Sequence, residues 1–499
     1  MEEDESYGCC STCIFRWQMI IASQPGTLFK PLKLDDGSAV DELRDESYGR
    51  PKMIPYDEVQ RHKAADDCWI IIKGQVYDIT EFIGSHPGGE HAILDQAGKD
   101  ATETFSMIHP PDAIDIFPPE MLLGPVDPTT MPAPEENIMS EDELRRQAAR
   151  EEMPEAHNLH LLQDFEHWAE RVLSGTAWAY YRLTRSKVTF HENRNAFQRY
   201  FFRPRVLRDT SSGSTGSSFL DVPTSMPVFI SPAAMAKLGH PLGEVNLTKA
   251  AGDTGVVQVS RGIFAARQND QNLIFQLYLN KDRSLSRSLI EKVEKLGARA
   301  IMFTVDVCWQ SKRTLDVRSK SNPPQSSTTS SSAKGISQAI SGYQDTNLTW
   351  KDIPFIRSNT KLPIVVKGVQ SLEDVEMCVQ TGVEGVVISN HGGRQADYAP
   401  APIDILYEIR CHRPDLFSKI DIMIDGGVRS GADVVKALAL GAKAVGIGRP
   451  CLYANGTHGE DGCRRVLEIL QEEINNTMRN IGVTRIEQLE PEMVGPAAF

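Results

Sequence analysis

The stretch IDIMIDGGVRSGADVVKALALGAKAVGIGRP, Ile420 to Pro450, decides the fold. Two short apolar runs, Ile420–Ile424 and Ala444–Ile447, flank a helical segment, and a glycine-rich loop follows each run. Apolar runs that alternate with helical segments are typical of parallel strands joined by crossover helices. The stretch therefore predicts a strand–helix–strand unit whose loops lie at the carboxyl ends of its strands.

The same alternation extends from about Ala156 to the end of the chain and predicts eight strands. They are Val228–Ile230, Val256–Val259, Ile274–Leu279, Ala300–Val305, Pro363–Val366, Gly385–Ser389, Ile420–Ile424 and Ala444–Ile447. Eight such units in roughly 300 residues predict an α/β fold of the (β/α)₈ TIM-barrel type rather than an open sheet. The Ser- and Thr-rich insert 318–346 is too polar to bury a core face, so we expect a mobile loop after the fourth strand.

Composition shifts divide the rest of the chain. A small α+β unit is indicated by the strand signals Trp69–Ile72 and Gln75–Ile79, and a Pro-, Glu- and Met-rich segment follows it. That segment is a predicted linker, helical in its second half. We predict an acidic disordered tail over 1–50, the small unit over 51–127, the linker over 128–155 and the barrel over 156–499.

Charge and composition exclude several functions for the 499 residues. A net charge of −14 argues against binding to nucleic acid or an anionic membrane surface. No apolar run approaches the ~18 residues of a membrane span, so none is expected. Nine scattered cysteines and an acidic tail, unlike a transit peptide, favour a reducing compartment, and we expect a cytoplasmic protein.

Two histidines of the small unit could hold a metal. His86 begins HPGGE, where a proline and two glycines present the imidazole on a tight loop. The segment from there to His109 predicts two short helices, so the chain can return and face the second imidazole toward the first, as haem iron requires. On the residues alone, a turn histidine and a helix-end histidine remain the alternative.

The unit as a whole resembles the cytochrome b5 family. The resemblance rests on DDCWIIIKGQVYDITEFIGSHPGG, AGKDATETF and IHP, and it covers almost the whole unit. It implies that haem b is bound there, with His86 and His109 as the axial iron ligands.

Polar residues follow the predicted barrel strands, where the active site of a TIM barrel lies. They are Ser260, Gln276, Tyr278, Thr304, Asp306, Arg313, Lys367, His391 and Arg394. DGGVRSG and GIGRP add Asp425, Gly427, Arg429, Gly448 and Arg449 at the position where barrels bind phosphate. Lys367 could stabilise a negatively charged reduced flavin.

SNHGGRQ, with Asp306 and Tyr180, resembles the active site of the FMN-dependent 2-hydroxy acid oxidoreductases. The resemblance implies that His391 takes a proton from the substrate, that Asp306 orients and stabilises it, and that Arg394 binds the substrate carboxylate. Tyr180, Tyr278 and Arg313 complete the implied catalytic set. The implied FMN-binding residues are Ala234, Ser260, Gln276, Thr304, Lys367, Asp425, Gly427, Arg429, Gly448 and Arg449.

A cytochrome b5-like unit followed by this barrel resembles the flavocytochrome b2 family. That resemblance implies oxidation of an L-2-hydroxy acid such as L-lactate, electron transfer from FMN through haem b to a one-electron acceptor such as cytochrome c, and a homotetramer. The family is found in the mitochondrial intermembrane space, which is the alternative compartment.

The substrate stays open because Arg261 and Gly262 stand where the family usually has a small hydroxyl residue and a leucine, beside the substrate side chain. A longer or aromatic acid is one alternative. A haem electron carrier with a non-catalytic barrel is the other.

Overall fold

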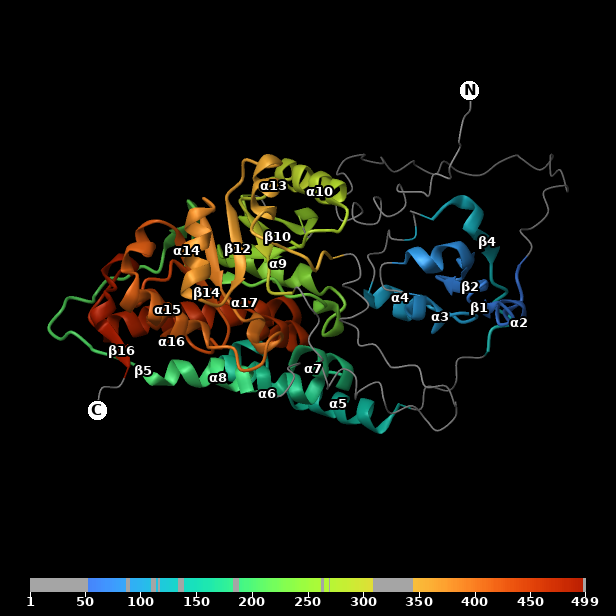
Figure 1. Ribbon diagram of the computed structural model, residues 1–499. Coiled ribbons are helices and arrows are strands. Elements are labelled where there is room, and N and C mark those ends of the chain that lie inside the picture. The colour runs from blue at the N-terminus through green and yellow to red at the C-terminus, as the bar shows by residue number, and fades with distance from the viewer. Residues whose placement is uncertain are drawn as a thin grey trace, which may run out of the picture. The chain divides into compact units, whose positions relative to one another are not determined.

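The computed structural model divides the chain into two compact units, one up to Ile138 and one from Met139 onward (Figure 1). The structure describes residues 53–86, 90–108, 114, 117–132, 139–182, 188–261, 264–268, 270–307 and 344–496. The predicted tail 1–50 and residues 318–343 of the predicted loop lie outside the described residues, and the predicted domain boundaries stay predictions.

The first unit is built on a four-stranded sheet in the order β1-β2-β3-β4. Its strands are β1 (Lys63–Ala64), β2 (Asp67–Ile72), β3 (Gln75–Asp78) and β4 (Leu122–Pro125). Lys73 and Gly74 join β2 to β3 with φ values of 51° and 75°, the left-handed conformation that two-residue hairpins favour. The two strands predicted for this unit are therefore present as a hairpin.

Short helices pack on both faces of this sheet, α2 on one and the others on the opposite face. They are α2 (Tyr56–Val59), η1 (Thr80–Ser85), α3 (Glu90–Leu94), α4 (Thr102–Ile108) and η3 (Pro119–Met121). Ile70 and Ile72 point into a core with Phe82 and Ile93, whereas Ile71 packs on the opposite face. This alternation along β2 gives the sheet two apolar faces.

The second unit contains the predicted barrel, closed by eight parallel strands. They are β8 (Val228–Ile230), β9 (Val257–Ser260), β10 (Leu273–Leu277), β11 (Ile301–Thr304), β12 (Ile364–Val369), β13 (Gly385–Ile388), β14 (Asp421–Asp425) and β15 (Ala444–Ile447). Closure comes from the parallel pairing of β15 with β8. All eight predicted strands are confirmed within a few residues at each end.

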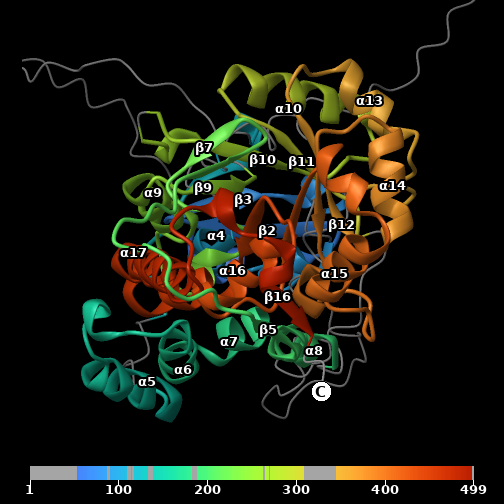
Figure 2. The same ribbon diagram turned by 90° about the vertical axis from the view of Figure 1, so that its left-hand side faces the viewer.

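Helices surround these strands (Figure 2). Those after the first strand are α9 (Glu244–Thr254), α10 (Arg283–Lys295), α13 (Asp352–Ser358), α14 (Leu372–Gln380), α15 (Pro402–His412), α16 (Gly431–Ala439) and α17 (Arg449–Asn480). α17 is interrupted at Gly459, whose φ of 59° and ψ of −131° are not helical. Among the described helices, none is both long and apolar enough to cross a bilayer.

Further elements precede the barrel strands. They are α5 (Glu141–Glu152), α6 (Leu162–Val172), α7 (Gly175–Arg182), α8 (Val188–Ala196), β5 (Tyr200–Phe202), β6 (Ser217–Phe219) and β7 (Val222–Thr224). α5 begins with a capping box in which Ser140 and Glu143 satisfy each other's backbone N–H groups. β5 pairs antiparallel with β16 (Val494–Pro496) and so ties the segment before the barrel to the last described residues of this unit.

The barrel interior is a packed apolar core rather than a channel. Inward side chains such as Phe229, Ile274 and Met423 fill it, together with Phe219 and Leu220 from the β6–β7 hairpin. The backbone N–H of Leu220 donates to Asp421, the first residue of β14, over 2.7 Å. The hairpin therefore covers the amino end of the barrel, and the carboxyl end is the side on which TIM barrels bind their ligands.

We expect the Phe219→Ala variant to lose about 3–5 kcal/mol of unfolding free energy, because the buried ring leaves a cavity inside the barrel. Phe219 is 1% exposed, and its ring centroid lies 5.9 Å from that of Phe229. Phe201→Ala is the matched control: Phe201 is 52% exposed, and its loss should change stability by only roughly 0.5 kcal/mol. Equal shifts of the two urea midpoints would contradict this account of the hairpin.

Candidate active site

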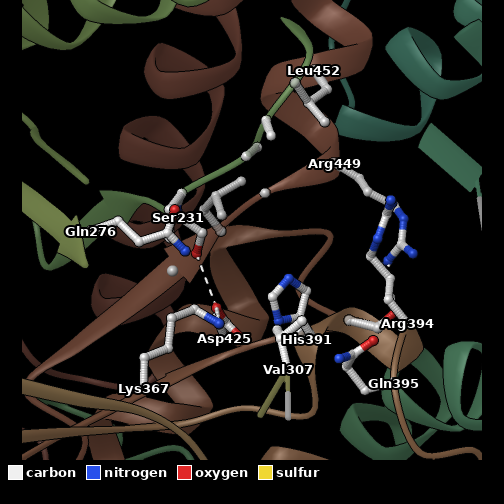
Figure 3. A pocket seen from close by; sticks show the side chains of 18 of the residues that line it. Ser231, Gln276, Val307, Lys367, His391, Arg394, Gln395, Asp425, Arg449 and Leu452 are labelled. Carbon is white, nitrogen blue, oxygen red and sulfur yellow. Dashed lines mark hydrogen bonds and ion pairs between the residues drawn. The ribbon is translucent and has the colours of Figure 1, made fainter. Parts of the chain in front are cut away.

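A pocket opens where the strands β8 to β15 end at their carboxyl side (Figure 3). It is lined by many of the predicted site residues: Tyr180, Ala234, Gln276, Tyr278, Lys367, His391, Arg394, Asp425, Gly427, Arg429, Gly448 and Arg449. Thr304 and Asp306 lie directly behind this lining and contact it. Ser260 is buried at the end of β9, and Arg313 lies outside the described residues.

His391 and Asp306 form the central pair of the pocket. Nδ1 of His391 lies 3.0 and 3.1 Å from the two carboxylate oxygens of Asp306, whose side chain is fully buried. An ionised Asp306 accepts a hydrogen bond from Nδ1–H, which leaves Nε2 as the basic nitrogen of a neutral imidazole. The pair therefore has the geometry of an oriented general base.

The surroundings lower the pKa values of both Asp306 and His391. Burial works to raise the pKa of Asp306, but the charge of His391, its hydrogen bond and the charge of Lys367 hold that pKa below its ordinary value. Burial lowers the pKa of His391, and Asp306 offsets only part of that effect. Asp306 is thus ionised and His391 neutral at neutral pH.

The turn that carries His391 is unusual in its backbone. His391, Gly392 and Gly393 have φ values of 57°, 63° and 74°. A Cβ on Gly393 would lie 2.8 Å from the backbone nitrogen of Phe190 in α8, so this position needs glycine. Next to the turn, Asn390 and Asn193 of α8 exchange two amide hydrogen bonds of 2.7 and 2.8 Å.

Neither of these asparagines was among the predicted site residues. They lie far apart in the chain, and no motif links them. Their reciprocal hydrogen bonds hold α8 against the turn and so fix the direction of the imidazole.

A buried ion pair lies on one side of His391 (Figure 3). Lys367 Nζ, from β12, lies 3.2 Å from Asp425 Oδ2 and donates to Ser389 Oγ over 2.9 Å. Ser389 in turn donates to Asp425, and Ser231 lies 3.3 Å from the same carboxylate. Burial works to lower the pKa of Lys367, but Asp425 and Asp306 raise it above its ordinary value. The ammonium is therefore charged at neutral pH, although its side chain is only 3% exposed.

Ser231 and Ser389 were not among the predicted site residues. Each directly follows a barrel strand, β8 and β13 respectively, which is the signal that could have identified them.

Three arginines lie around the other side of the pocket. Arg394 donates to the carbonyl of Tyr180 over 3.1 Å, and its guanidinium carbon lies 5.0 Å from the centroid of that ring. Arg449 donates to the carbonyls of Tyr181 and Gly392 over 2.8 and 2.9 Å. In Figure 3 the side chains of Arg394 and Arg449 lie next to each other.

Burial and mutual repulsion destabilise the charged forms of these arginines. Burial, together with Arg394 and Arg429, lowers the pKa of Arg449 to about 9, and burial likewise lowers the pKa of Arg429. Nε of Arg429 is buried without a hydrogen bond among the described residues, and the carboxylate of Glu166 lies 3.6 Å away. An anion bound here would offset the repulsion between the arginines and could accept the missing hydrogen bond of Arg429 Nε. Because α17 begins at Arg449, its first backbone N–H groups would also face such an anion.

Polar groups from β10 and β11 line the far side of the pocket. Gln276 donates to Thr304 over 3.1 Å and lies 3.2 Å from the hydroxyl of Tyr278. Gln276 is 5% exposed, so its amide is fixed rather than solvated. A fixed amide of this kind could form hydrogen bonds with the polar edge of a planar ring system.

The small unit places His86 at the end of η1, where its ring packs edge-on against Phe82 at 5.8 Å. Phe82 belongs to the apolar core of that unit. His109 lies outside the described residues, so the predicted pairing of the two histidines stays a prediction.

A packed barrel with an oriented histidine–aspartate pair, a buried lysine and a cationic site for phosphate defines a class of protein, the barrel oxidoreductases that bind a phosphate-bearing flavin. Residues 169–496 match the profile of the FMN-dependent dehydrogenases, and residues 55–141 match that of the cytochrome b5-like heme/steroid binding domain. The chain belongs to the FMN-dependent dehydrogenase family. Its cofactors are accordingly FMN and haem.

Similar proteins share this organisation. L-lactate dehydrogenase (cytochrome) of Wickerhamomyces anomalus is 42% identical over 452 residues, which are 87% of this chain and 78% of the relative. The enzyme of the same name from Saccharomyces cerevisiae is 40% identical over 467 residues, 88% of this chain and 78% of the relative. A peroxisomal (S)-2-hydroxyacid oxidase of Arabidopsis thaliana is 38% identical over 344 residues, 66% of this chain and 94% of the relative.

Solved structures agree with the fold. The flavin-binding domain of baker's yeast flavocytochrome b2 superposes with a TM-score of 0.66 at 40% identity and covers 72% of this chain and 91% of that one. A mandelate oxidase with (S)-4-hydroxymandelic acid gives a TM-score of 0.62 at 32% identity, over 68% of this chain and all of that one. The resemblance to the flavocytochrome b2 family is thereby confirmed.

We expect Asp425→Asn to lower the unfolding free energy of the cofactor-free protein by about 3–5 kcal/mol, because it leaves the charge of Lys367 buried without its carboxylate. Urea unfolding measures the change. Asp415→Asn is the control, since Asp415 pairs with Arg413 and Lys419 at the surface. Its midpoint should barely move. If Asp425→Asn is equally silent, the Lys367–Asp425 pair does not stabilise the barrel as described.

Proposed function

We propose that this chain oxidises an L-2-hydroxy acid to the 2-oxo acid and passes the electrons from FMN through haem b to a one-electron acceptor such as cytochrome c. The observation that carries the proposal is the oriented His391–Asp306 pair, which shares one pocket with Lys367 and Arg394. L-lactate is the first substrate to test, because the two fungal relatives are named L-lactate dehydrogenase (cytochrome).

The residues present fit FMN. Two buried arginines would hold the phosphate: Arg429, in the loop between β14 and α16, and Arg449, the first residue of α17. Gly448 leaves room beside Arg449, because a Cβ there would meet nothing closer than 4.0 Å. Gly427 also lines the pocket, and it must be glycine because a Cβ there would overlap the carbonyl of Asn193. Lys367 would lie beside the flavin ring.

The remaining implied contacts come from the strand ends. Gln276, Thr304 and Ser260 would bind polar edges of the ring, and Ala234 lines the pocket after β8. When bound, FMN accepts two electrons from the substrate, and haem iron carries them onward one at a time.

The chain's own residues supply the acid–base chemistry. The planar guanidinium of Arg394 would bind the substrate carboxylate in two parallel hydrogen bonds, beside Tyr180. His391 Nε2 would take a proton from the substrate, and the imidazolium that forms is stabilised by the carboxylate of Asp306. Tyr278 would contact the substrate hydroxyl. Arg313 is proposed as a second arginine at the same site.

Other aspects of the proposal rest on the family alone. We propose a homotetramer with cytochrome c as a protein partner. The cytoplasmic location and its alternative, the mitochondrial intermembrane space, both stay predictions.

Anaerobic addition of L-lactate to the holoenzyme should bleach the flavin absorbance and then produce the bands of reduced haem. In His86→Ala the flavin should still bleach, but the haem bands and the reduction of cytochrome c should be lost, because the iron lacks an axial ligand. His62→Ala is the control. The ring of His62 stacks on that of Trp69 with a centroid distance of 3.6 Å, and the variant should retain haem. A flavin that no 2-hydroxy acid bleaches would instead support a haem carrier with a non-catalytic barrel.

The pH dependence of kcat/KM should report on His391. A protonated imidazole cannot accept a proton, so activity falls as the pH drops; because burial lowers the pKa of His391 below 6.5, the acid limb should lie below pH 6.5. Asp306→Asn removes the group that raises this pKa, so the limb should move to still lower pH while kcat falls roughly 10²–10⁴-fold. An acid limb above pH 6.5, or one that Asp306→Asn leaves in place, contradicts His391 as the base.

A further inference from the structure

The amide pair of Asn193 and Asn390 contacts two functional loops of the pocket, although the proposed chemistry does not use it. The two side chains belong to residues that are 2% and 1% exposed, and neither residue is part of the described lining of the pocket. Asn390 directly precedes His391, whereas Asn193 lies in α8, distant in the chain. The pair therefore acts, if at all, through the residues around it.

The amide of Asn390 has a single orientation that satisfies its neighbours. Its Oδ1 accepts from Asn193 Nδ2 over 2.8 Å and from the backbone N–H of Gly393 over 3.0 Å. Its Nδ2 donates to Asn193 Oδ1 over 2.7 Å and to the carbonyl of Pro400 over 3.0 Å. Both amide protons and both acceptor sites are thus used, so a rotated amide would lose these bonds. Because Asn390 and Gly393 flank His391, this amide holds both ends of the turn that carries the imidazole.

The glycine loop after β14, which consists of Gly426 and Gly427, packs on the same amide pair. A Cβ on Gly426 would lie 3.3 Å from Nδ2 of Asn193 and 3.8 Å from Oδ1 of Asn390. A Cβ on Gly427 would lie 2.0 Å from the carbonyl oxygen of Asn193, so the backbones of this loop and of α8 are in direct contact. The loop leads to Arg429, one of the two arginines that would hold the cofactor phosphate. The amide pair is therefore the point at which α8 meets both loops.

Ion pairs extend the contact between α8 and the phosphate site. Arg194, the residue after Asn193, lies 3.4 Å from the carboxylate of Glu166, and the same carboxylate lies 3.6 Å from Nε of Arg429. A displacement of α8 would therefore disturb the counter-charge of Arg429 together with the hydrogen-bond partner of Asn390.

Arg449 also joins the two sites, because it donates to the carbonyl of Gly392 over 2.9 Å. It is itself a proposed phosphate ligand, so its removal would change binding and positioning together. Asn193 lies outside the described lining, and its removal takes away no proposed ligand of the cofactor or the substrate.

We propose that Asn193 is a positioning residue that couples the two loops. Its amide orients His391 for proton abstraction and, through the same contact with Asn390, holds the glycine loop in the conformation that binds the cofactor phosphate. The catalytic half of this inference rests on the proposed 2-hydroxy acid oxidation. The affinity for FMN tests the other half without turnover.

The test begins with Asn193→Ala. In the holoenzyme with L-lactate, kcat should fall roughly 10–100-fold, because a small displacement of a base from its reacting position has an effect of this size. The dissociation constant of FMN, measured on the cofactor-free chain by quenching of flavin fluorescence, should rise roughly 3–10-fold, which corresponds to the loss of about one hydrogen-bonded contact.

Two further readouts separate positioning from a general loss of stability. Burial lowers the pKa of His391, Asp306 raises it, and Lys367 and Arg394 lower it further. An imidazole that turns away from Asp306 loses the raising contribution, so the acid limb of kcat/KM should move to lower pH in Asn193→Ala. In the Asp306→Asn background the same substitution should lower kcat by roughly threefold at most, because the pair through which Asn193 acts is already broken.

Asn246→Ala is the matched control. Asn246 is 1% exposed, lies in α9 and donates to Oδ1 of Asn455 over 2.9 Å, so it is also a buried helical asparagine paired with a second one. Neither member of that pair is part of the described lining of the pocket. The control should lose stability in urea, as Asn193→Ala does, but keep its kcat, its acid limb and its affinity for FMN.

Asn193→Ser is the second variant, for use if Asn193→Ala does not fold. Its hydroxyl leaves space for a water that can bridge to Asn390. The fall in kcat and the rise in the dissociation constant should both be smaller than in the alanine variant, and the acid limb should move in the same direction.

The outcomes separate this inference from the proposed function. If L-lactate bleaches the flavin but Asn193→Ala matches Asn246→Ala in kcat, or if its loss adds in full to that of Asp306→Asn, Asn193 does not position the base. A fall in kcat with unchanged affinity for FMN, or the reverse, overturns the coupling of the loops. If no 2-hydroxy acid bleaches the wild-type flavin, the proposed function fails, and a wild-type affinity for FMN in Asn193→Ala would overturn the coupling as well.

Discussion

The parallel pairing of β15 with β8 is the constraint on which the rest of the site depends. It closes the barrel, and its hydrogen bonds continue to Ser231, whose N–H donates to the carbonyl of Ile447. Closure brings the first strand end against the last two, so that Ser231 approaches Asp425 and the loops after β14 and β15 share one rim. Because the β6–β7 hairpin closes the amino end, the polar groups of the barrel mouth gather at the carboxyl end, where the core stops.

The charged groups around that rim determine which ligands the pocket favours. The chain is acidic overall, with a net charge of −14, yet its pocket collects one lysine and four arginines against one lining carboxylate. Charges interact more strongly here than in water, because the surroundings of these groups are less polarisable. The lowered pKa of Arg449 is one result. Such a cavity favours ligands with several negative charges, which a phosphate-bearing flavin and a carboxylate substrate provide together.

The orientation of His391 is a product of packing as much as of sequence. Its turn has three successive left-handed residues, and α8 packs so closely that Gly393 has no room for a side chain. The motif SNHGGRQ was recognisable because this geometry demands glycines. The reciprocal amide contacts of Asn390 with Asn193 were not recognisable, since Asn193 carries no local signal and the separation of the two residues in the chain hides the contact.

The sequence by itself determined the eight strands, the order of polar residues at their ends and the glycine-rich loops, because strand periodicity and left-handed glycines are local properties of the chain. It also marked Lys367, Asp306 and His391. The pairing of Asp306 with His391 was expected from the family resemblance. Only the tertiary structure decided the other contacts: that Lys367 meets Asp425 and Ser389, and that Gly427 makes room for α8. It likewise placed Arg261 beside Tyr278. These contacts join distant segments, and their distances follow from barrel closure, which no local pattern encodes.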